Sequence, residues 1–103
     1  MEQPRLPPVA RREIRTAAEQ GDYARAAVLA AIVAPGMEGP LSTFQSEMEA
    51  YERARLVSNW HRALRSLADA RSAAIACGMP ELESVVTHRL FDIVRLHHEG
   101  RKP

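Results

Sequence analysis

Apolar residues recur every three or four positions along most of this chain, and glycine and proline interrupt the pattern at a few points. That spacing places apolar side chains on one face of an α-helix. The pattern predicts an all-α fold of four or five helices, arranged as a small helical bundle or as stacked helical hairpins. Its predicted parts, within a single domain over 1–103, are a proline-rich arm at 1–8, a helical hairpin at 8–34, a long or broken central helix at 41–77, and an antiparallel C-terminal helix at 80–98.

The predicted hairpin has clear turn signals. Gly21 ends its first helix, and Asp22 caps its second helix, which spans about 23–34. This second helix is apolar on nearly every side, and Arg25 is its only charged residue. A helix of that kind is expected to be covered on several sides.

The central region contains no glycine or proline between Ser42 and Cys77. Ser42, with Gln45 three residues later, has the spacing of a capping box and predicts the start of the helix. A continuous helix of this length would extend for about 54 Å, whereas a compact domain of this size is about 33 Å across. We therefore expect either a bend near Ser58 and Asn59 or a protruding helix that packs on a second chain.

The residues from Ala17 to Ala26 combine a Gly-Asp-Tyr turn with a small residue, Ala26, three positions after the tyrosine. Glycine permits the turn, aspartate caps the next helix, tyrosine packs back and alanine allows the helices to approach closely. This segment resembles the turn within a tetratricopeptide repeat, over about 20 residues. The sequence departs from that family at Ala30, where an aromatic residue is expected, and at Pro35, which comes about a turn early.

A weaker similarity, at 73–83, is to the junction between successive helical repeats. The resemblance implies helical hairpins that hold a partner's helix or extended segment against an apolar groove. A generic helical bundle is the alternative interpretation.

Charge and composition narrow the function classes. The chain has 103 residues, with 14 basic and 13 acidic side chains, so its formal net charge is +1. A near-neutral chain is not typical of an obligate nucleic-acid binder. A single cysteine excludes an intrachain disulfide. No apolar run approaches the length of a membrane span, and the N-terminus lacks the apolar region of a secretory signal, so a cytoplasmic location is expected.

The charges are separated along the central region. Residues 38–52 carry −4, and residues 53–71 carry five arginines and one aspartate, or +4. Local pairs such as Glu49–Arg53 and Glu52–Arg55 suit a solvated helix. Antiparallel pairing of two copies, each acidic half against a basic half, is the sharper hypothesis and predicts a homodimer.

Catalytic or metal-binding residues are not evident in the sequence. His88 and Asp92 lie four residues apart, but His97 and His98 point in different directions around a helix. A zinc site needs three or four converging ligands. Cys77 is interpreted as a small packing residue. We expect no enzyme activity, no metal and no cofactor.

The sequence therefore favours a non-enzymatic protein–protein interaction module, such as a small adaptor, chaperone or regulator that also self-associates. Large apolar side chains are candidate partner contacts, although core packing is the more common role of each. These candidates are Tyr23, Phe44, Met48, Tyr51 and Trp60. The weaker alternatives are nucleic-acid association through Arg55, Arg62 and Arg65, which also complete the set of candidate partner-binding residues, and a phage or bacterial inhibitor that masks a partner's surface.

Overall fold

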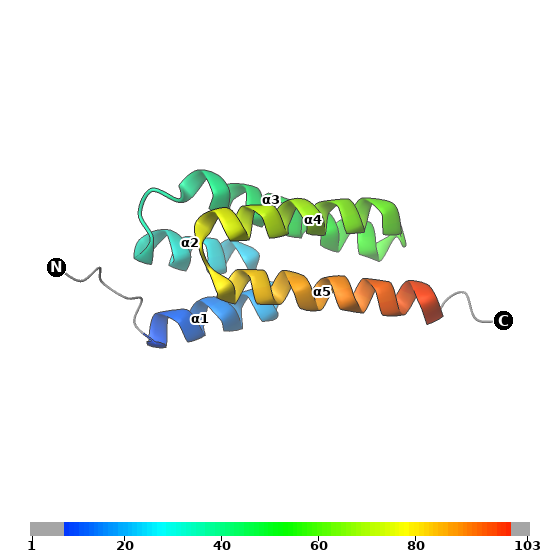
Figure 1. The fold of residues 1–103 in the computed structure, drawn as a ribbon, viewed down its shortest axis with the longest axis horizontal. Coiled ribbons are helices and arrows are strands. Elements are labelled where there is room, and N and C mark those ends of the chain that lie inside the picture. The colour runs from blue at the N-terminus through cyan, green and yellow to red at the C-terminus, as the bar shows by residue number, and fades with distance from the viewer. Residues whose placement is uncertain (1–7, 100–103) are drawn as a thin grey trace.

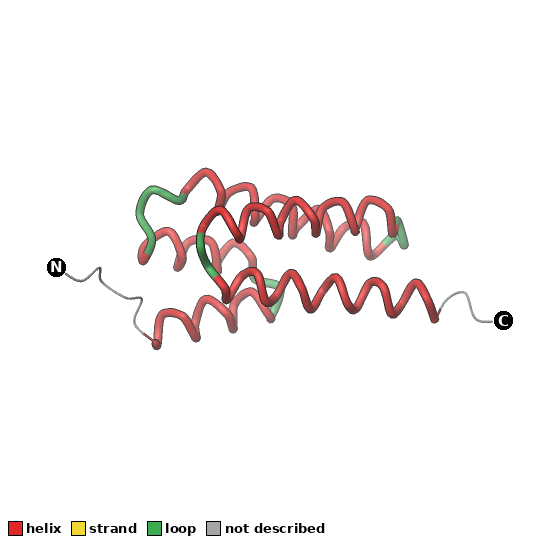
Figure 2. Tube along the Cα trace, viewed as in Figure 1, coloured by secondary structure: helices red, strands yellow, loops and turns green. Residues whose placement is uncertain are grey.

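The computed structural model describes residues 8–99 of the chain, and residues 1–7 of the predicted arm at 1–8 lie outside them. The described part is an all-α bundle, as the pattern predicted. It contains five helices, α1 (Pro8–Glu19), α2 (Tyr23–Val33), α3 (Glu38–Leu56), α4 (Trp60–Cys77) and α5 (Pro80–Glu99). Short turns connect the helices (Figure 2).

Each helix contacts the next helix in the chain, and α1 also contacts α5, so that the contacts form a closed ring (Figure 1). The core lies inside this ring. Tyr23 of α2 and Phe44 of α3 meet edge to face, with ring centroids 6.2 Å apart, in a geometry that the aromatic quadrupole favours. Leu67 of α4 and Ile93 of α5 are fully buried in the same core.

The central region divides into two helices, so the broken-helix alternative is correct and the continuous rod is not formed. Ser58 adopts a left-handed conformation with φ of 56°, and the Asn59 backbone N–H donates to the Ala54 carbonyl over 2.8 Å. The Asn59 side chain then accepts a hydrogen bond from the Arg62 backbone N–H at 3.2 Å. Helix α3 therefore ends in a Schellman-type motif, and the N-cap of α4 follows at the next residue. This arrangement reverses the chain and places α4 against α3.

The turn between α1 and α2 has the same construction. Gly21 is left-handed with φ of 83°, Asp22 donates its N–H to the Ala17 carbonyl, and its side chain caps α2. In both turns the capping residue is followed by an aromatic residue, Tyr23 or Trp60. The predicted cap at Asp22 is therefore confirmed, and the tetratricopeptide-like origin of this hairpin stays a prediction.

The predicted capping box at Ser42 and Gln45 is wrong. Helix α3 begins at Glu38, four residues earlier, and no side chain caps it. Pro40 is accommodated because the first backbone N–H groups of a helix have no intrahelical acceptor, so a missing one costs little. The Gln45 side chain donates instead to Glu49, one turn along the helix.

Helix α2 is less covered than expected. Within the described residues it contacts only α1 and α3, and Val28 and Ile32 on its outer side are 59% and 70% exposed. The expectation that an almost wholly apolar helix is covered on several sides is therefore not met within this chain.

The cap assignment can be tested by replacing Asn59 with alanine. Loss of the side-chain bond to the Arg62 N–H should lower the free energy of unfolding by about 1 kcal/mol. Ser42→Ala is the matched control, because an exposed serine inside α3 should change stability by less than about 0.5 kcal/mol. Urea unfolding measures both, and a larger loss for Ser42→Ala would show that α3 begins at Ser42.

Candidate functional site

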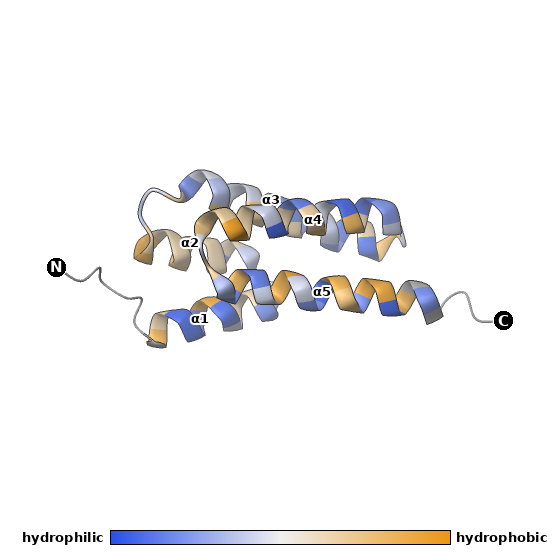
Figure 3. Ribbon diagram, in the orientation of Figure 1, coloured by the Kyte–Doolittle hydropathy of each residue, from blue (hydrophilic) through white to orange (hydrophobic). Residues whose placement is uncertain are grey.

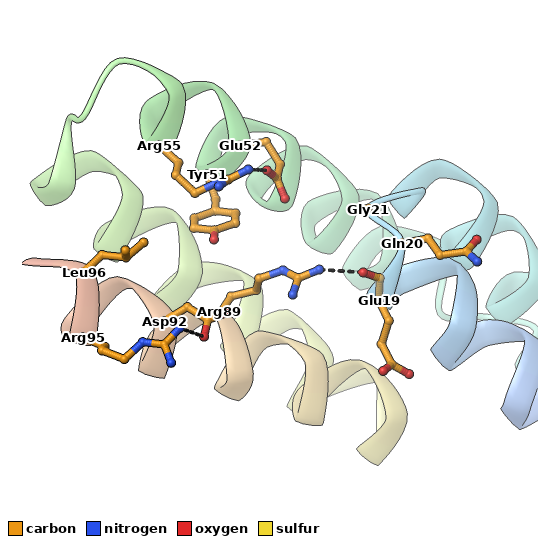
Figure 4. A pocket seen from close by; sticks show the side chains of 10 residues that line it. All are labelled: Glu19, Gln20, Gly21, Tyr51, Glu52, Arg55, Arg89, Asp92, Arg95 and Leu96. Atoms are coloured by element: carbon orange, nitrogen blue, oxygen red, sulfur yellow. Dashed lines mark hydrogen bonds and ion pairs between the residues drawn. The ribbon is translucent and has the colours of Figure 1, made fainter.

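A groove opens between α3 and α5 at the place where the α1–α2 hairpin ends. Helices α1 and α2 have 12 and 11 residues, whereas α3, α4 and α5 have 18 to 20, so the hairpin covers only part of the longer helices (Figure 1). The groove has a volume of about 600 Å³. Its walls, shown in Figure 4, are formed by Glu19, Gln20, Gly21, Tyr51, Glu52, Arg55, Arg89, Asp92, Arg95 and Leu96.

Hydrogen bonds beside this groove join α2 to α3 and α1 to α5. The Tyr23 hydroxyl of α2 donates to Glu52 Oε2 of α3 at 2.6 Å, and the Arg55 guanidinium donates to the other oxygen of Glu52 at 3.1 Å. Arg89 of α5 donates to the backbone carbonyl of Glu19, in the last turn of α1, at 2.8 Å (Figure 4). Carbonyls in the last turn of a helix have no intrahelical donor, so Arg89 satisfies one of them.

Burial keeps the tyrosines of this region neutral. Burial, together with the hydrogen bond to Glu52, raises the pKa of Tyr23 above its usual value, and burial raises the pKa of Tyr51. A neutral hydroxyl can donate a hydrogen bond to a carboxylate, whereas a phenolate would be repelled by it. The Tyr23–Glu52 bond is therefore a charge-assisted hydrogen bond, which stabilises more than a neutral one.

The charges that line the groove balance. Arg55 pairs with Glu52, and Arg95 lies 3.5 Å from Asp92, each pair being one turn apart on its own helix. Arg89 has no carboxylate within ion-pair distance in the part of the chain that the structure describes. Its remaining N–H groups make it the residue best suited to bind a carbonyl or carboxylate of a ligand. The groove as a whole suits a polar peptide segment better than a polyanion.

Large apolar side chains are exposed beyond the groove, where the turn between α3 and α4 meets the C-terminal half of α5. Six of the ten large apolar side chains that are exposed within the described residues lie on these segments. Figure 3 shows apolar positions along the C-terminal half of α5. We call this region the open end; it comprises Leu56, Val57, Leu64, Phe91, Val94 and Leu96. These side chains lie on more than one side of α5, because Val94 and Leu96, two residues apart, are separated by about 200° around the helix. Leu96 lines the groove, whereas Phe91 lines a separate hollow with Pro80 and Thr87.

Four of the five predicted apolar contacts lie in the core instead of on the surface. The exposed fractions of these side chains are 2% or less; they are Tyr23, Phe44, Met48 and Tyr51. Trp60 is half-buried and packs against the same core. The first four are therefore core residues, which is the more common role of large apolar side chains.

The three predicted arginines are exposed, but the structure separates them. Arg55 lines the groove between α3 and α5, whereas Arg62 lines a different hollow, between α3 and α4, together with Arg53. Arg65 is exposed on α4. The reversal of the chain at Asn59 explains this separation, because it places Arg55 and Arg62 on different helices.

Other candidate chemistry is sparse in the described part of the chain. Among the side chains that the structure describes, no three histidine, cysteine, aspartate or glutamate residues converge as metal ligands would. The His88 ring lies within hydrogen-bond distance of the Ser84 carbonyl on its own helix. Cys77 is buried, and burial raises the pKa of its thiol, so the reactive thiolate is disfavoured. None of these helices has both the length and the apolar character that crossing a membrane requires.

Sequence reasoning missed Arg89. It stands in an ordinary amphipathic stretch of α5, and its acceptor, the Glu19 carbonyl, lies 70 residues earlier in the chain. The only signal available in the sequence was its position four residues before Ile93, which places it at the edge of the apolar face of α5.

Comparisons with protein-family models, with curated proteins and with solved structures found no match to this chain. The geometry described above is therefore the basis for the proposed function.

The hydrogen bond between Tyr23 and Glu52 can be tested with Tyr23→Phe. Loss of a bond to a charged group should lower the free energy of unfolding near neutral pH by about 1–3 kcal/mol. The pKa of Tyr23 is raised in the folded state, so above about pH 10 the unfolded chain loses this proton before the folded protein does, and stability falls as the pH rises. Tyr23→Phe should lose less stability than the wild type over this alkaline range, as measured by urea unfolding at each pH.

Tyr51→Phe is the control for this experiment. The Tyr51 ring is equally buried, but its hydroxyl forms no hydrogen bond with any described residue. Its removal should cost less than that of the Tyr23 hydroxyl near neutral pH. Equal losses for the two variants would contradict a stabilising role for the Tyr23–Glu52 bond.

Proposed function

We propose that this protein is a non-enzymatic protein–protein interaction module, which acts as a small adaptor, chaperone or regulator. A helix or extended segment of another protein binds in the groove between α3 and α5 and continues over the open end. The groove is lined mainly by charged side chains, so it differs from the apolar groove that the sequence suggested. Leu96 is its exposed apolar side chain, whereas Tyr51, which also lines it, is 2% exposed.

The supporting observation is the incomplete cover of the bundle. The α1–α2 hairpin ends beside Arg89, and the longer helices continue beyond it with six large apolar side chains exposed. Burying apolar surface contributes about 25 cal/mol per Å². A partner segment that covers Leu56 and Leu96 would gain the free energy of burying their apolar surface. Arg89 would donate hydrogen bonds that fix the position of this segment.

The weaker alternatives gain no specific support from the structure. Nucleic-acid binding would require the arginines to form one basic surface, but Arg55 and Arg62 line different hollows and acidic side chains neutralise the groove. An inhibitor that masks a partner's surface would use the same groove, so the experiment below applies to it as well.

The groove can be tested by affinity purification from the cells that produce the protein, using a variant with both Leu56→Glu and Leu96→Glu. Both side chains are exposed, so the fold should persist, whereas a charge placed in an apolar interface should weaken partner retention by about tenfold or more. Quantitative mass spectrometry of the retained proteins gives the measurement.

Ala68→Glu is the matched control, because Ala68 is exposed on α4 and lines neither the groove nor the open end. A partner should be retained by the wild type and by this control, and should be lost with the double variant. Retention that is equal for all three proteins would contradict binding at this site.

A further inference from the structure

The outer face of the α1–α2 hairpin is an uncovered apolar surface, distinct from the groove. Val28 and Ile32 lie one turn apart on the outer side of α2 and are 59% and 70% exposed. Val9, near the start of α1, is 63% exposed. These three residues are as exposed as those of the open end, but they lie on the two helices that take least part in the rest of the bundle.

The exposed side chains of Ile32 and Val9 lie at one end of this face, and a hollow lies at the other end. Ile32 is in the last turn of α2, and Val9 is in the first turn of the antiparallel α1, so both lie at the end away from the α1–α2 turn. Near that turn, the seam between the helices forms a hollow of about 320 Å³. Its lining residues are Arg12, Glu13, Thr16, Ala17, Gln20, Asp22 and Arg25.

A twofold axis through Val28 would bring these two features together. In an antiparallel pair of α2 helices centred on Val28, Ile32 of one copy lies opposite Ala24 of the other, since each is four residues from the axis. Ala24 is exposed and small, and it adjoins Arg25, which lines the hollow. The projecting end of each copy would therefore meet the hollow of the other, as an isologous interface requires.

Charge is also complementary in this arrangement. Arg25 has no carboxylate within ion-pair distance among the residues that the structure describes. The twofold axis places it beside the last turn of the other copy's α2. The carbonyls of that turn have no intrahelical donor and carry partial negative charge, so an arginine there is favourable.

We propose that the outer face of the α1–α2 hairpin binds a second copy of this chain, which forms a two-fold dimer with four hairpin helices at its centre. The inference rests on the proposed function, protein–protein interaction, and assigns self-association to a surface separate from the groove. It replaces the dimer suggested by the charge pattern of 38–71, because the fold-back of α4 on α3 removes the protruding helix on which that dimer depended.

The size of the face sets the expected affinity. The three exposed apolar residues and the lining of the hollow make about ten residues a side. A standard stable interface has about 20–30. We therefore expect weak dimerisation, with a dissociation constant of about 10–100 µM. Sedimentation equilibrium from about 5 to 500 µM covers the transition expected for this affinity.

The wild-type protein should change from monomer to dimer over this range. Ile32→Glu should remain a monomer throughout, with unchanged far-UV circular dichroism, because its side chain is exposed in the monomer. Ile75→Glu is the matched control: Ile75 is also exposed but lies on α4, which does not contact the hairpin, and this variant should dimerise as the wild type does. A wild type that is monomeric at 500 µM, or a dimer that Ile32→Glu leaves intact, overturns the proposal.

Val28→Cys provides an independent test of the axis. A residue on a twofold axis faces its own copy, so mild oxidation should give a disulfide-linked dimer, whereas Ile75→Cys and the wild type, with buried Cys77, should not cross-link. Equal cross-linking of the two cysteine variants would overturn the proposed geometry. The two proposals can fail separately. The variant with Leu56→Glu and Leu96→Glu should lose its partner and still dimerise, whereas Ile32→Glu should keep the partner and remain a monomer.

Discussion

The difference in helix length is the constraint on which the exposed surfaces of this protein depend. Helix α1 is at least six residues shorter than α3, α4 and α5, which amounts to about 9 Å of uncovered bundle. The left-handed turn at Gly21 sets this limit, because it reverses the chain before α1 reaches the end of α5. Both the groove and the open end follow from the place where that turn occurs.

The polar contacts beside the groove fix the position of the α1–α2 hairpin. Alanine provides much of the hairpin's buried surface, and such small side chains gain little from burial. The partly buried bond from Tyr23 to Glu52 and the exposed bond from Arg89 to the Glu19 carbonyl both link the hairpin to the longer helices. The first contributes more to specifying its position, because a buried polar group must find its partner. The same contacts place Arg89 at the end of the groove, so stability and the candidate site share one set of residues.

The local signals in the sequence were sufficient where a residue acts on its own neighbours. The cap at Asp22 and the turn at Gly21 depend on contacts within five residues. The break near Ser58 and Asn59 does too, but the sequence left it as one of two alternatives, the other being a protruding helix. The capping-box spacing of Ser42 and Gln45 predicts too late a start for α3, which begins at Glu38 because the first turn of a helix tolerates Pro40. The groove was not predicted, because it combines side chains from α1, α3 and α5 that are up to 77 positions apart in the sequence.

The sequence alone predicted that the chain is helical and where most of its helices begin and end. It did so because helix periodicity and capping depend on residues within one or two turns of each other. Only the tertiary structure decided which apolar side chains are core and which are surface, because helices with similar stripes differ in how many neighbours cover them. Phe44 and Phe91 are both aromatic residues on amphipathic helices. Phe44 is buried on α3, which packs against α2 and α4, whereas Phe91 is on the solvent-facing side of α5.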